Sequence, residues 1–456
     1  MKTKGKFAAL KWTARIIGTS IVLITVLFFF GYLLEGYQNT HKISLTGFDT
    51  FQILTFILWF LGLAGLVLAW WKEGTGGFIS FFFTAIFLIL VGTNPGERFV
   101  PLLLVFLGPS LLYIIYWWLT KKPFFLSGKF SYRIRSLGNF FGAAMSVSIH
   151  RLLHGPKLPG WTLIFETSMR YLRHQSEYAY QLSDIRESRK FTDSLVFRSA
   201  AIEKVHWTKV KGPIKGKWYV PPAAREGTVI LYLHGGGYAY YSRSHYNLMA
   251  LVALATGSKL LAPDYRLAPE HPFPAQIEDA KSAYRWLLES GYSSNQIILA
   301  GDSAGGNLVL ALLVALKDEK EPLPAAAVCI APWTDLTNTG KSMEVNDPYD
   351  WIDQRMADKW AGWYCKGSEV SNPLISPRPQ DMKGMPPIYI QVGTAEILYD
   401  MIETFCSKAR EHGADVRLDI WEGMTHDFQA YGDDLKEAID ALGRIGRFAD
   451  EQLRAD

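Results

Sequence analysis

The feature that most constrains this chain is a long uncharged, apolar run near its N-terminus. The 19 residues from Ile16 to Leu34 carry no charged side chain and are rich in Ile, Val, Leu and Phe. About 20 apolar residues, at 1.5 Å per residue in a helix, cross the roughly 30 Å hydrocarbon core of a bilayer. The run therefore predicts a membrane-spanning helix.

Three more uncharged stretches follow before residue 121, and tryptophans lie near several of their ends, where indole rings favour the membrane interface. We predict four helical spans, at 16–34, 50–71, 76–94 and 99–120. The third has the shortest continuous apolar stretch, from Phe78 to Val91. A re-entrant or tilted segment is therefore the alternative there.

A cleaved signal peptide at residues 1–35 and a set of buried core helices are the alternatives to a membrane module. A signal peptide usually has a shorter apolar region and a small-residue cleavage site, and no such site follows Leu34. Core helices rarely lack charge on every face for about 20 residues. Both alternatives fit less well than an N-terminal transmembrane module over residues 1–130.

Charge is distributed unevenly along the chain. The formal net charge is +4, but residues 1–135 carry 13 Lys and Arg against 4 Asp and Glu, whereas the rest carries 34 against 39. The small overall balance does not indicate a nucleic-acid partner. Lys and Arg gather before the first span and after the fourth, and Lys72 lies between the second and third, while the other two loops hold only Lys42 and Arg98; this distribution predicts that both termini are cytoplasmic. If the third segment does not span, the body of the protein lies outside.

Residues 131–204 form a transition between the apolar front and the body. Phe140, Phe141, Ala144, Met145 and Ile149 recur at helical spacing, which fits an interfacial helix and equally a helix that faces the core. The stretch 161–193 also reads as helix. We expect an interfacial linker here, together with helices that cap the domain that follows.

From about residue 205, short apolar runs alternate with amphipathic segments. The predicted helices are 245–256, 276–290, 304–317, 400–412 and 434–452. The predicted strands are Thr228–Leu233, Lys259–Pro263, Gln296–Ala300, Ala326–Ile330, Ile388–Val392 and Arg417–Trp421. Buried strands that alternate with helices predict an α/β fold with a mostly parallel sheet covered on both faces.

The first chemical motif is Gly301-Asp302-Ser303-Ala304-Gly305, a G-x-S-x-G directly after a predicted strand and before a predicted helix. Glycines flank the serine because it sits on a sharp turn with a sparsely allowed backbone. The pentapeptide alone is a weak signal, since Gly and Ser are common in turns. The strand–turn–helix context indicates a nucleophilic serine.

The second motif is His234-Gly235-Gly236-Gly237-Tyr238, at the end of an earlier predicted strand. Successive glycines let backbone N–H groups turn toward a ligand, and such donors stabilise the oxyanion that forms when an acyl carbonyl is attacked. A glycine-rich turn with a structural histidine is the alternative. The nucleophile turn downstream favours the oxyanion interpretation.

With these motifs in place, the chain resembles the hormone-sensitive-lipase-like branch of the α/β-hydrolases over about residues 205–456. The matching segments, in chain order, are HGGGY at 234–238, PDYRLAPEHPFPA at 263–275, GDSAGGN at 301–307, APWTDL at 331–336, NPLISP at 372–377, VGTAEILYD at 392–400 and GMTH at 423–426. The resemblance implies an α/β-hydrolase fold with a helical cap, formed by the helices before residue 205 and an insertion at about 333–375. The transmembrane module lies outside it.

The resemblance also implies roles for individual residues. Ser303 corresponds to the nucleophile, His426 to the general base, and Glu396 to the acid that orients the imidazole. The chain order serine, acid, histidine is the one expected for this fold. The backbone N–H groups of Gly235, Gly236 and Ala304 would form the oxyanion hole. From their position in the glycine run, Gly237 and Tyr238 are candidates for substrate contact, and simple packing of Tyr238 is the alternative.

Two positions depart from the family pattern. Glu396 stands where Asp is frequent, and Asp400 is an available alternative four residues on; a carboxylate one methylene longer still reaches an imidazole, which favours Glu396. Asn372 also stands where Asp is frequent, in the expected cap segment. Asp264, Arg266 and Glu270 form a charged cluster, which we interpret as a structural loop network rather than a substrate site.

The sequence thus predicts a membrane-anchored serine carboxylesterase or lipase-like hydrolase that works through an acyl-enzyme, on short to medium acyl or amphiphilic, lipid-derived esters. Neither a cofactor nor a metal is expected, since Cys329, Cys365 and Cys406 have no zinc spacing. The expected partners are a small-molecule ester and the lipid bilayer, with the catalytic domain in the cytoplasm. A deacetylase or amidase with the same triad and a non-catalytic small-molecule receptor are the alternatives.

Overall fold

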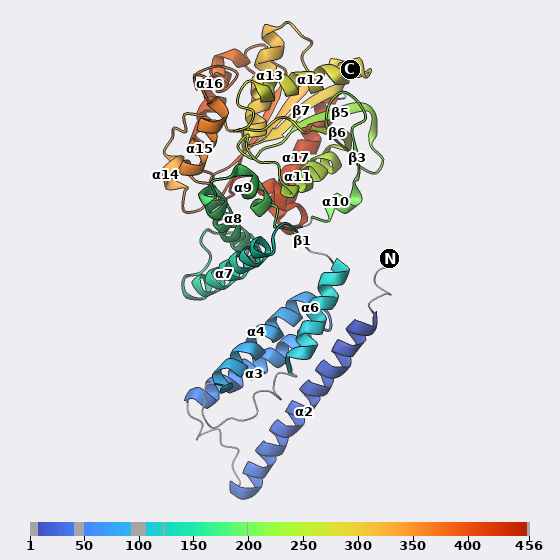
Figure 1. Ribbon diagram of the computed structural model, residues 1–456, viewed down its shortest axis with the longest axis vertical. Helices are drawn as coiled ribbons and strands as arrows, with labels where there is room; N and C mark the ends of the chain where they lie inside the picture. The colour runs from blue at the N-terminus through green and yellow to red at the C-terminus, as the bar shows by residue number, and fades with distance from the viewer. Residues whose placement is uncertain (1–7, 41–49, 93–105, 122–123, 198, 454–456) are drawn as a thin grey trace. The chain divides into compact units, whose positions relative to one another are not determined.

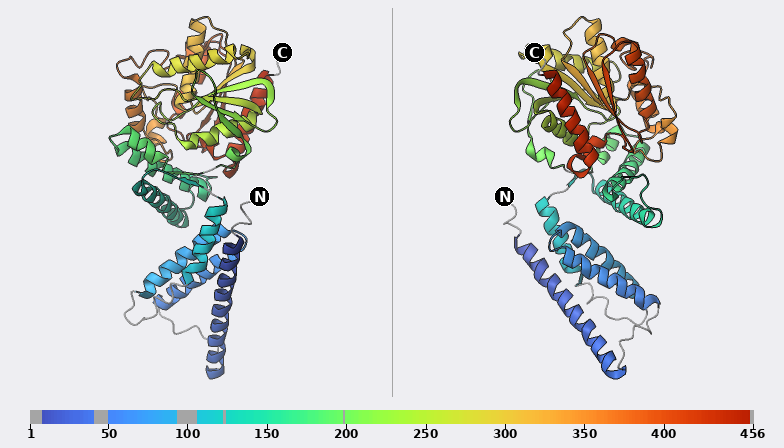
Figure 2. Two further views of the ribbon diagram at one scale, coloured as in Figure 1. Left: turned by 45° about the vertical axis from the view of Figure 1, so that its right-hand side comes forward. Right: turned by 180° about the vertical axis from the view of Figure 1, so that it is seen from behind.

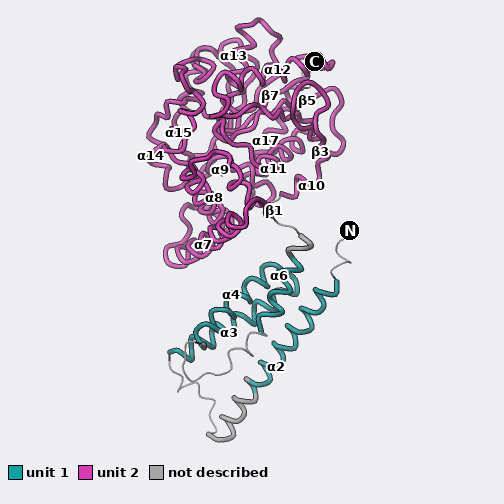
Figure 3. Tube along the Cα trace, in the orientation of Figure 1, with its two compact units in different colours: residues 1–123 teal, residues 124–456 magenta. Residues whose placement is uncertain are grey.

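The computed structural model describes residues 8–40, 50–92, 106–121, 124–197 and 199–453. The chain divides into two compact units, Met1–Pro123 and Phe124–Asp456 (Figure 3). The sequence predicts the boundary at residue 130, whereas the first strand of the second unit already begins at Phe124 because it pairs with a strand of that unit.

The first unit consists, in its described part, of apolar helices. They are α2 (Ala8–Thr40), α3 (Thr50–Leu68), α4 (Glu73–Gly92) and α6 (Leu107–Lys121). Three segments are long and apolar enough to cross a membrane: Ala8–Phe28, Thr50–Leu68 and Glu73–Val91. The third predicted span, 76–94, is therefore helical over its described residues, 76–92. The fourth helix, α6, is shorter, with an apolar part at Leu107–Trp117, and the start of that predicted span, 99–105, lies outside the described residues.

Small residues let the helices of the first unit approach each other closely. A Cβ atom at Gly65 of α3 would lie 2.4 Å from the backbone nitrogen of Ser80 in α4, which no side chain tolerates. The Ser80 hydroxyl also lies 2.7 Å from that of Ser110 in α6. Glycine and serine contacts of this kind are typical of helices that pack within a bilayer.

The second unit is built on an eight-stranded sheet of order β10-β9-β8-β7-β5-β6-β4-β3 (Figure 1). Its strands are β3 (His206–Lys209), β4 (Gly216–Val220), β5 (Arg225–Leu233), β6 (Ser258–Pro263), β7 (Ile297–Asp302), β8 (Ala326–Ile330), β9 (Ile388–Gly393) and β10 (Val416–Trp421). The strands from β5 to β10 are parallel to one another. At one edge of the sheet, β4 pairs antiparallel with β6, and β3 pairs antiparallel with β4. The predicted α/β fold is confirmed, and the bounds of each predicted strand lie within three residues of the observed bounds.

Helices cover both faces of this sheet (Figure 2). Val229, Leu231 and Leu233 of β5 face a core shared with α12 (Ala275–Glu289), α13 (Ala304–Asp318) and α16 (Tyr399–Glu411). The alternate residues Ile230 and Tyr232 face the opposite core, with α11 (Arg243–Thr256) and α17 (Lys436–Leu453). This alternation follows from the twofold period of a strand, and it explains why β5 reads as a continuous apolar run.

The remaining elements lie before the sheet and in its loops. Those that precede it are β1 (Phe124–Leu126), α7 (Phe130–His154), α8 (Leu163–Gln181), α9 (Ile185–Thr192), β2 (Leu195–Phe197) and α10 (Ala201–Lys204). Those in its loops are η2 (Ser294–Gln296), α14 (Ser342–Val345), α15 (Gln354–Cys365), η3 (Pro379–Met382) and η4 (Phe428–Asp434). Of the segments expected to form a cap, the one before residue 205 is thus largely helical, whereas 333–375 is mostly loop and contains the helices α14 and α15.

Candidate active site

The candidate site residues lie on loops at the carboxyl ends of neighbouring parallel strands. The glycine run follows β5, Ser303 follows β7, Glu396 follows β9 and His426 follows β10. Residues far apart in sequence thereby meet at one edge of the sheet, where ligands bind in open α/β folds.

Ser303 occupies a strained turn between β7 and α13. Its φ of 53° and ψ of −120° lie in a region that non-glycine residues rarely adopt. The backbone holds this conformation, since the Ser303 N–H donates to the carbonyl of Ile330 at 2.8 Å and its carbonyl accepts from Asn307 and Trp333, each at 3.0 Å. The side chain is therefore fixed at the N-terminus of a 15-residue helix that is buried over most of its length.

The glycines on both sides of the serine are required by close backbone contacts. A Cβ atom at Gly301 would lie 2.5 Å from the carbonyl oxygen of Gly305, and one at Gly305 would lie 2.0 Å from the carbonyl oxygen of Leu233. The turn thus packs directly against the end of β5, as the strand–turn–helix motif predicts.

The glycine loop after β5 is pressed against the same turn. A Cβ atom at Gly235 would lie 2.2 Å from a carboxylate oxygen of Asp302, and Gly236 has a φ of 96°. Asp302 accepts a 2.7 Å hydrogen bond from the hydroxyl of Tyr232, which ties the serine turn to the end of β5. Within the described structure, the N–H groups of Gly235 and Gly236 donate to no protein atom, which leaves both free for a ligand.

The two residues that flank the glycines are packed inside the protein. His234 is stacked between the rings of Tyr241 and Tyr265, at 3.9 and 4.1 Å, and burial holds the pKa of its imidazole well below the usual value. Tyr238 is fully buried, stacks on Tyr364 at 3.8 Å and donates its hydroxyl to the side chain of Asn307 at 2.5 Å. Both side chains hold the loop in place, and that of Tyr238 does not face an open pocket.

His426 and Glu396 form a buried pair. The His426 Nδ1 atom lies 3.3 Å from Glu396 Oε2, and the other carboxylate oxygen, Oε1, accepts a 2.6 Å hydrogen bond from the N–H of Gly393. Asp400, the alternative acid, instead accepts a 2.8 Å hydrogen bond from the N–H of Ser342. The structure therefore brings Glu396, and not Asp400, to the imidazole.

The second ring nitrogen of His426 faces a carboxylate to which no sequence motif points. His426 Nε2 lies 3.4 Å from Asp427 Oδ2, and Asp427 Oδ1 is buried without a hydrogen-bond partner among the described residues. Burial alone would lower the pKa of His426, but the charges of Asp427 and Glu396 raise it. No hydrogen bond joins the Ser303 hydroxyl to His426 in the described part of the chain.

A further buried acid, Asp350, supports the acid loop. Its two carboxylate oxygens accept hydrogen bonds from the N–H groups of Trp351 and Ile397, at 2.8 and 2.9 Å. Burial raises the pKa of this carboxyl to about 6, and the nearby charge of His426 opposes that rise. Nothing in the motifs points to Asp350, because it lies 46 residues before Glu396 in a segment without a periodic pattern.

Helix α8 is fixed to the loop that carries the histidine. Trp161, just before α8, donates its indole N–H to the carbonyl of Gly423 at 2.6 Å. The hydroxyl of Thr425 lies 2.9 Å from the sulfur of Met169 in α8. The cap expected from the sequence thus contacts the histidine side of the site.

Helices α9 and α15 are fixed to the glycine loop. Arg189 of α9 donates to the carbonyl of Ala239 at 2.7 Å, and the hydroxyls of Ser188 and Tyr240 lie 2.9 Å apart. The ring of Trp360 in α15 packs edge-on against Tyr240. These contacts leave Ser303 only 6% exposed and His426 2% exposed.

The charged cluster after β6 is structural, as expected. Arg189 binds both carboxylate oxygens of Glu270, at 2.8 and 2.9 Å, and Arg266 pairs with Asp279 at 2.8 Å. Asp264 pairs with Lys217 at 3.2 Å. Each charge is therefore matched by a neighbouring element of the fold.

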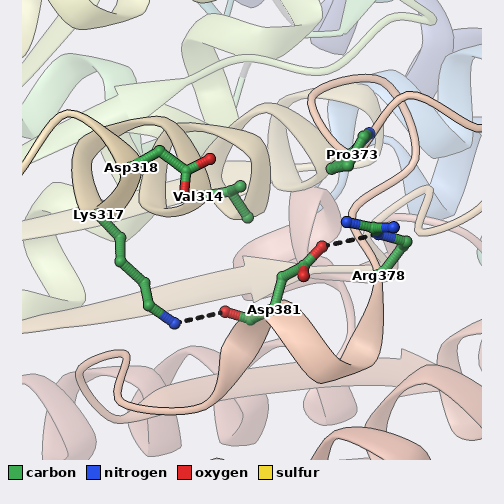
Figure 4. A pocket seen from close by; sticks show the side chains of 6 residues that line it. All are labelled: Val314, Lys317, Asp318, Pro373, Arg378 and Asp381. Atoms are coloured by element: carbon green, nitrogen blue, oxygen red, sulfur yellow. Dashed lines mark hydrogen bonds and ion pairs between the residues drawn. The ribbon is translucent and has the colours of Figure 1, made fainter.

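Two small cavities lie away from the serine. One, of about 130 Å³, lies at the C-terminal end of α13 and is lined by Val314, Lys317, Asp318, Pro373, Arg378 and Asp381 (Figure 4). The other, of about 250 Å³, is lined by Leu158, Pro159, Asn346, Tyr349, Thr394, Ala395, Glu422 and Gly423. Neither is lined by Ser303 or His426. Within the described residues no group of three or more His, Cys, Asp or Glu side chains could hold a metal ion.

Comparisons with known families divide the chain in the same way as its two units. Residues 230–430 match a family model described as the alpha/beta hydrolase fold, and residues 1–124 match a domain of unknown function (DUF7670). An acetyl-hydrolase from Streptomyces hygroscopicus is 41% identical over 239 residues, which cover 52% of this chain and 80% of the relative.

Solved structures show the same similarity. An esterase from the bacterial hormone-sensitive lipase family is 34% identical, with a TM-score of 0.54, over 72% of this chain and all of its own. The esterase EstE5, solved after soaking with p-nitrophenyl butyrate, is 34% identical with a TM-score of 0.57, over 69% of this chain and 99% of its own.

Proposed function

The chain belongs to the hormone-sensitive-lipase-like family of α/β-hydrolases and is a carboxylesterase, and we propose that Ser303, His426 and Glu396 are its catalytic triad. The observation that carries the proposal is the buried His426–Glu396 pair, 3.3 Å apart, at the same sheet edge as a serine held on a strained turn. Perturbed, buried titratable groups in such a place are typical of active sites.

In the first half of the proposed reaction, the hydroxyl oxygen of Ser303 attacks the ester carbonyl and forms a bond to its carbon. His426 accepts the hydroxyl proton and then donates it to the departing alcohol as the ester C–O bond breaks. Glu396 accepts from Nδ1, which orients the ring and stabilises the imidazolium. The product of this half is an acyl group on Ser303 and a free alcohol.

In the second half, a water molecule gives a proton to His426 and attacks the acyl carbonyl. The bond between that carbon and the Ser303 oxygen breaks, the serine recovers its proton, and the carboxylic acid leaves. Both halves pass through an oxyanion. We propose that the N–H groups of Gly235, Gly236 and Ala304 stabilise it, supported by the free glycine donors and by the N-terminus of α13.

We propose that the ester accepted by the site has a short to medium acyl chain. The relatives support this range, since one is named an acetyl-hydrolase and the crystals of another were soaked with a butyrate ester. Gly237 contributes to the wall of the site, because its Cα faces the ring of Trp360 so closely that a Cβ atom would lie 2.5 Å away. Trp360 then limits the room beside the glycine loop.

We further propose that the first unit anchors the enzyme in a membrane, with the catalytic unit in the cytoplasm. Three helices of sufficient length and apolarity support anchoring. The Lys and Arg residues at 121–135 support the side, since such residues favour the cytoplasmic end of a span. A tag at the C-terminus should be inaccessible from outside intact cells, and labelling from outside would contradict the orientation.

The test of the function is hydrolysis of p-nitrophenyl esters of increasing chain length by the full chain in detergent, with Ser303→Ala as the control. We expect the rate to be highest for short and medium chains and lost in the control. Equal rates for the two proteins would refute catalysis by this site. Acetanilide-type amides in the same assay distinguish an amidase, which would hydrolyse them as fast as the esters.

A further inference from the structure

Helix α7 packs against the rest of the second unit with only one of its faces. Tyr132, Ser136, Ala143 and Val147 are buried, and their spacings of four, seven and four residues place them on one side of the helix. Ser136 bonds to the side chain of Gln175 in α8, and α7 and α8 lie side by side in Figures 1 and 2. The fold therefore explains the inner face of α7 completely.

The opposite face of the same helix is apolar and exposed. At 100° per residue, five large apolar side chains fall within an arc of roughly 100°, on the side of the helix away from the buried positions. They are 53% exposed at Ile134, 54% at Met145, 53% at Ile149, 86% at Leu152 and 68% at Leu153. We call these five residues the outer stripe.

An outer stripe of this size is costly in water. At about 25 cal/mol per Å² of apolar surface, side chains of this kind are stabilised when they leave water. Large contiguous apolar patches on a soluble surface mark sites of protein or membrane contact. We therefore expect the outer stripe to contact a protein or membrane surface outside the second unit.

The charges around α7 indicate what that partner is. From Arg98 to Phe165 the sequence has no Asp or Glu, while it has eight Lys and Arg. Lys129 and Arg151 are matched by Glu187 and Glu166, at 2.6 and 2.7 Å, but Arg133 and Arg135 have no acidic partner among the described residues. An apolar stripe beside basic side chains fits a bilayer surface with anionic headgroups.

The connection to the first unit supplies the second argument. Only the eight residues 122–129 separate α6 from α7. A fully extended chain covers about 3.3 Å per residue, so this linker spans at most about 30 Å. A helix tethered so closely to a membrane anchor meets the bilayer surface before any freely diffusing protein.

We propose that the outer stripe of α7 lies in the interface of an anionic lipid bilayer, with Arg133 and Arg135 at the headgroups. This inference rests on the proposed membrane attachment and goes beyond it, because it makes the catalytic unit itself a membrane-contacting body. The helical spacing of apolar residues in this segment fits an interfacial helix and a core-facing helix equally well. In the structure α7 has one face packed against α8 and one apolar face exposed.

The test uses the full chain with single introduced cysteines, reconstituted in vesicles. Cys329, Cys365 and Cys406 are all buried, so an introduced surface cysteine is labelled selectively. Met145→Cys and Ile149→Cys place an environment-sensitive nitrobenzoxadiazole label on the outer stripe. Glu411→Cys, on the exposed end of α16, is the matched control, and Ile57→Cys on α3 reports the proposed span.

The vesicles contain phosphatidylcholine, alone or mixed with phosphatidylglycerol, and acyl chains with or without bromine as a quencher. We expect labels at 145 and 149 to emit at shorter wavelength and to be quenched by bromine, more strongly with phosphatidylglycerol, while the label at 411 does neither. Equal quenching with and without phosphatidylglycerol would refute the anionic headgroups.

The remaining outcomes separate the inference from the function on which it rests. If position 57 is quenched while 145 and 149 behave like 411, the anchor holds and the inference is wrong. If 145 and 149 emit at shorter wavelength without quenching, protein covers the stripe and the inference is also wrong. If no position is quenched, the proposed membrane attachment fails as well.

Discussion

The two halves of the site are built by different means. The serine half, formed by the loops after β5 and β7, depends on backbone: glycines without room for a Cβ atom and a serine at a φ of 53°. The histidine half, formed by the loops after β9 and β10, depends on side chains that reach each other from distant positions, with His426 against Glu396 and Asp427. One half is fixed by local geometry and the other by electrostatics.

This difference predicts different responses to mutation. In the serine half a change either removes the nucleophile or disturbs the backbone that carries it, so the losses should be large and independent of pH. In the histidine half, a change alters the pKa or the tautomer of His426. Its effect should therefore depend on pH and on which residue replaces the acid.

The largest effect should come from Ser303→Ala. The variant keeps the turn, since alanine adds no atom to it, but it has no oxygen to form the acyl-enzyme. We expect kcat to fall by at least about 10⁵-fold, as in other enzymes that lose this nucleophile. Hydrolysis of p-nitrophenyl butyrate measures the loss, and a circular dichroism spectrum like that of the parent protein shows that the fold is retained. If kcat falls by less than tenfold, Ser303 is not the nucleophile.

Glu396→Gln should have the next largest effect. The amide has the same size but can present an N–H to Nδ1, which favours the wrong tautomer of His426, so we expect kcat to fall roughly 10³- to 10⁴-fold. Asp400→Asn is the matched control, because Asp400 bonds to the N–H of Ser342 and not to the imidazole. A greater loss in the control than in Glu396→Gln would reverse the assignment of the acid.

The same difference explains how much of the molecule the sequence could predict. The strands from β5 to β10 and the turn at Ser303 follow from local apolar runs and from glycines at fixed spacing. Strands β3 and β4 were not predicted, because they are short and β3 is exposed along its length. They pair only through the antiparallel register of β4 with β6, a contact between distant segments.

Within the site, the motifs pointed to Ser303, His426 and Glu396 alike, but not to the side chains that hold these residues and the glycine loop in place. The stacking of His234 between two tyrosines and the anchoring of α9 to the glycine loop through Arg189 depend on tertiary contacts. Asp350 and Asp427 carry no spacing signal, although Asp427 stands next to His426 in the sequence. Their importance appears only when burial and distance are known.

A backbone test of the serine half is Gly305→Ala. The added Cβ would lie 2.0 Å from the carbonyl oxygen of Leu233 and 2.5 Å from that of His234, and neither backbone group can move without distorting β5. Overpacking of this kind costs about 1–3 kcal/mol, which should lower Tm by several degrees. Gly362→Ala on α15 is the control, since nothing lies within 4 Å of its Cβ position. Equal melting temperatures for the two variants would contradict the close packing of the turn.

The smallest and most specific effect concerns the charge at His426. The base must be neutral to accept the serine proton, so activity is lost as pH falls through the pKa of His426. Burial by itself lowers that pKa, but the carboxylates of Asp427, Glu396 and Asp350 raise it. Asp427→Asn removes one of these charges, and we expect the acid limb of kcat/KM to move to lower pH by about one unit.

The control must change a charge without changing the field at the imidazole. Asp433→Asn serves, because the Asp433 side chain is 64% exposed and lies 3.7 Å from Lys204. We expect its pH profile to match the parent protein, since solvent screens an exposed charge of this kind. Burial raises the pKa of the Asp427 carboxyl itself, while His426 opposes that rise. If the acid limb of kcat/KM does not move in Asp427→Asn, the Asp427 carboxyl is protonated in the active enzyme. The negative charges that raise the pKa of His426 would then be those of Glu396 and Asp350 alone.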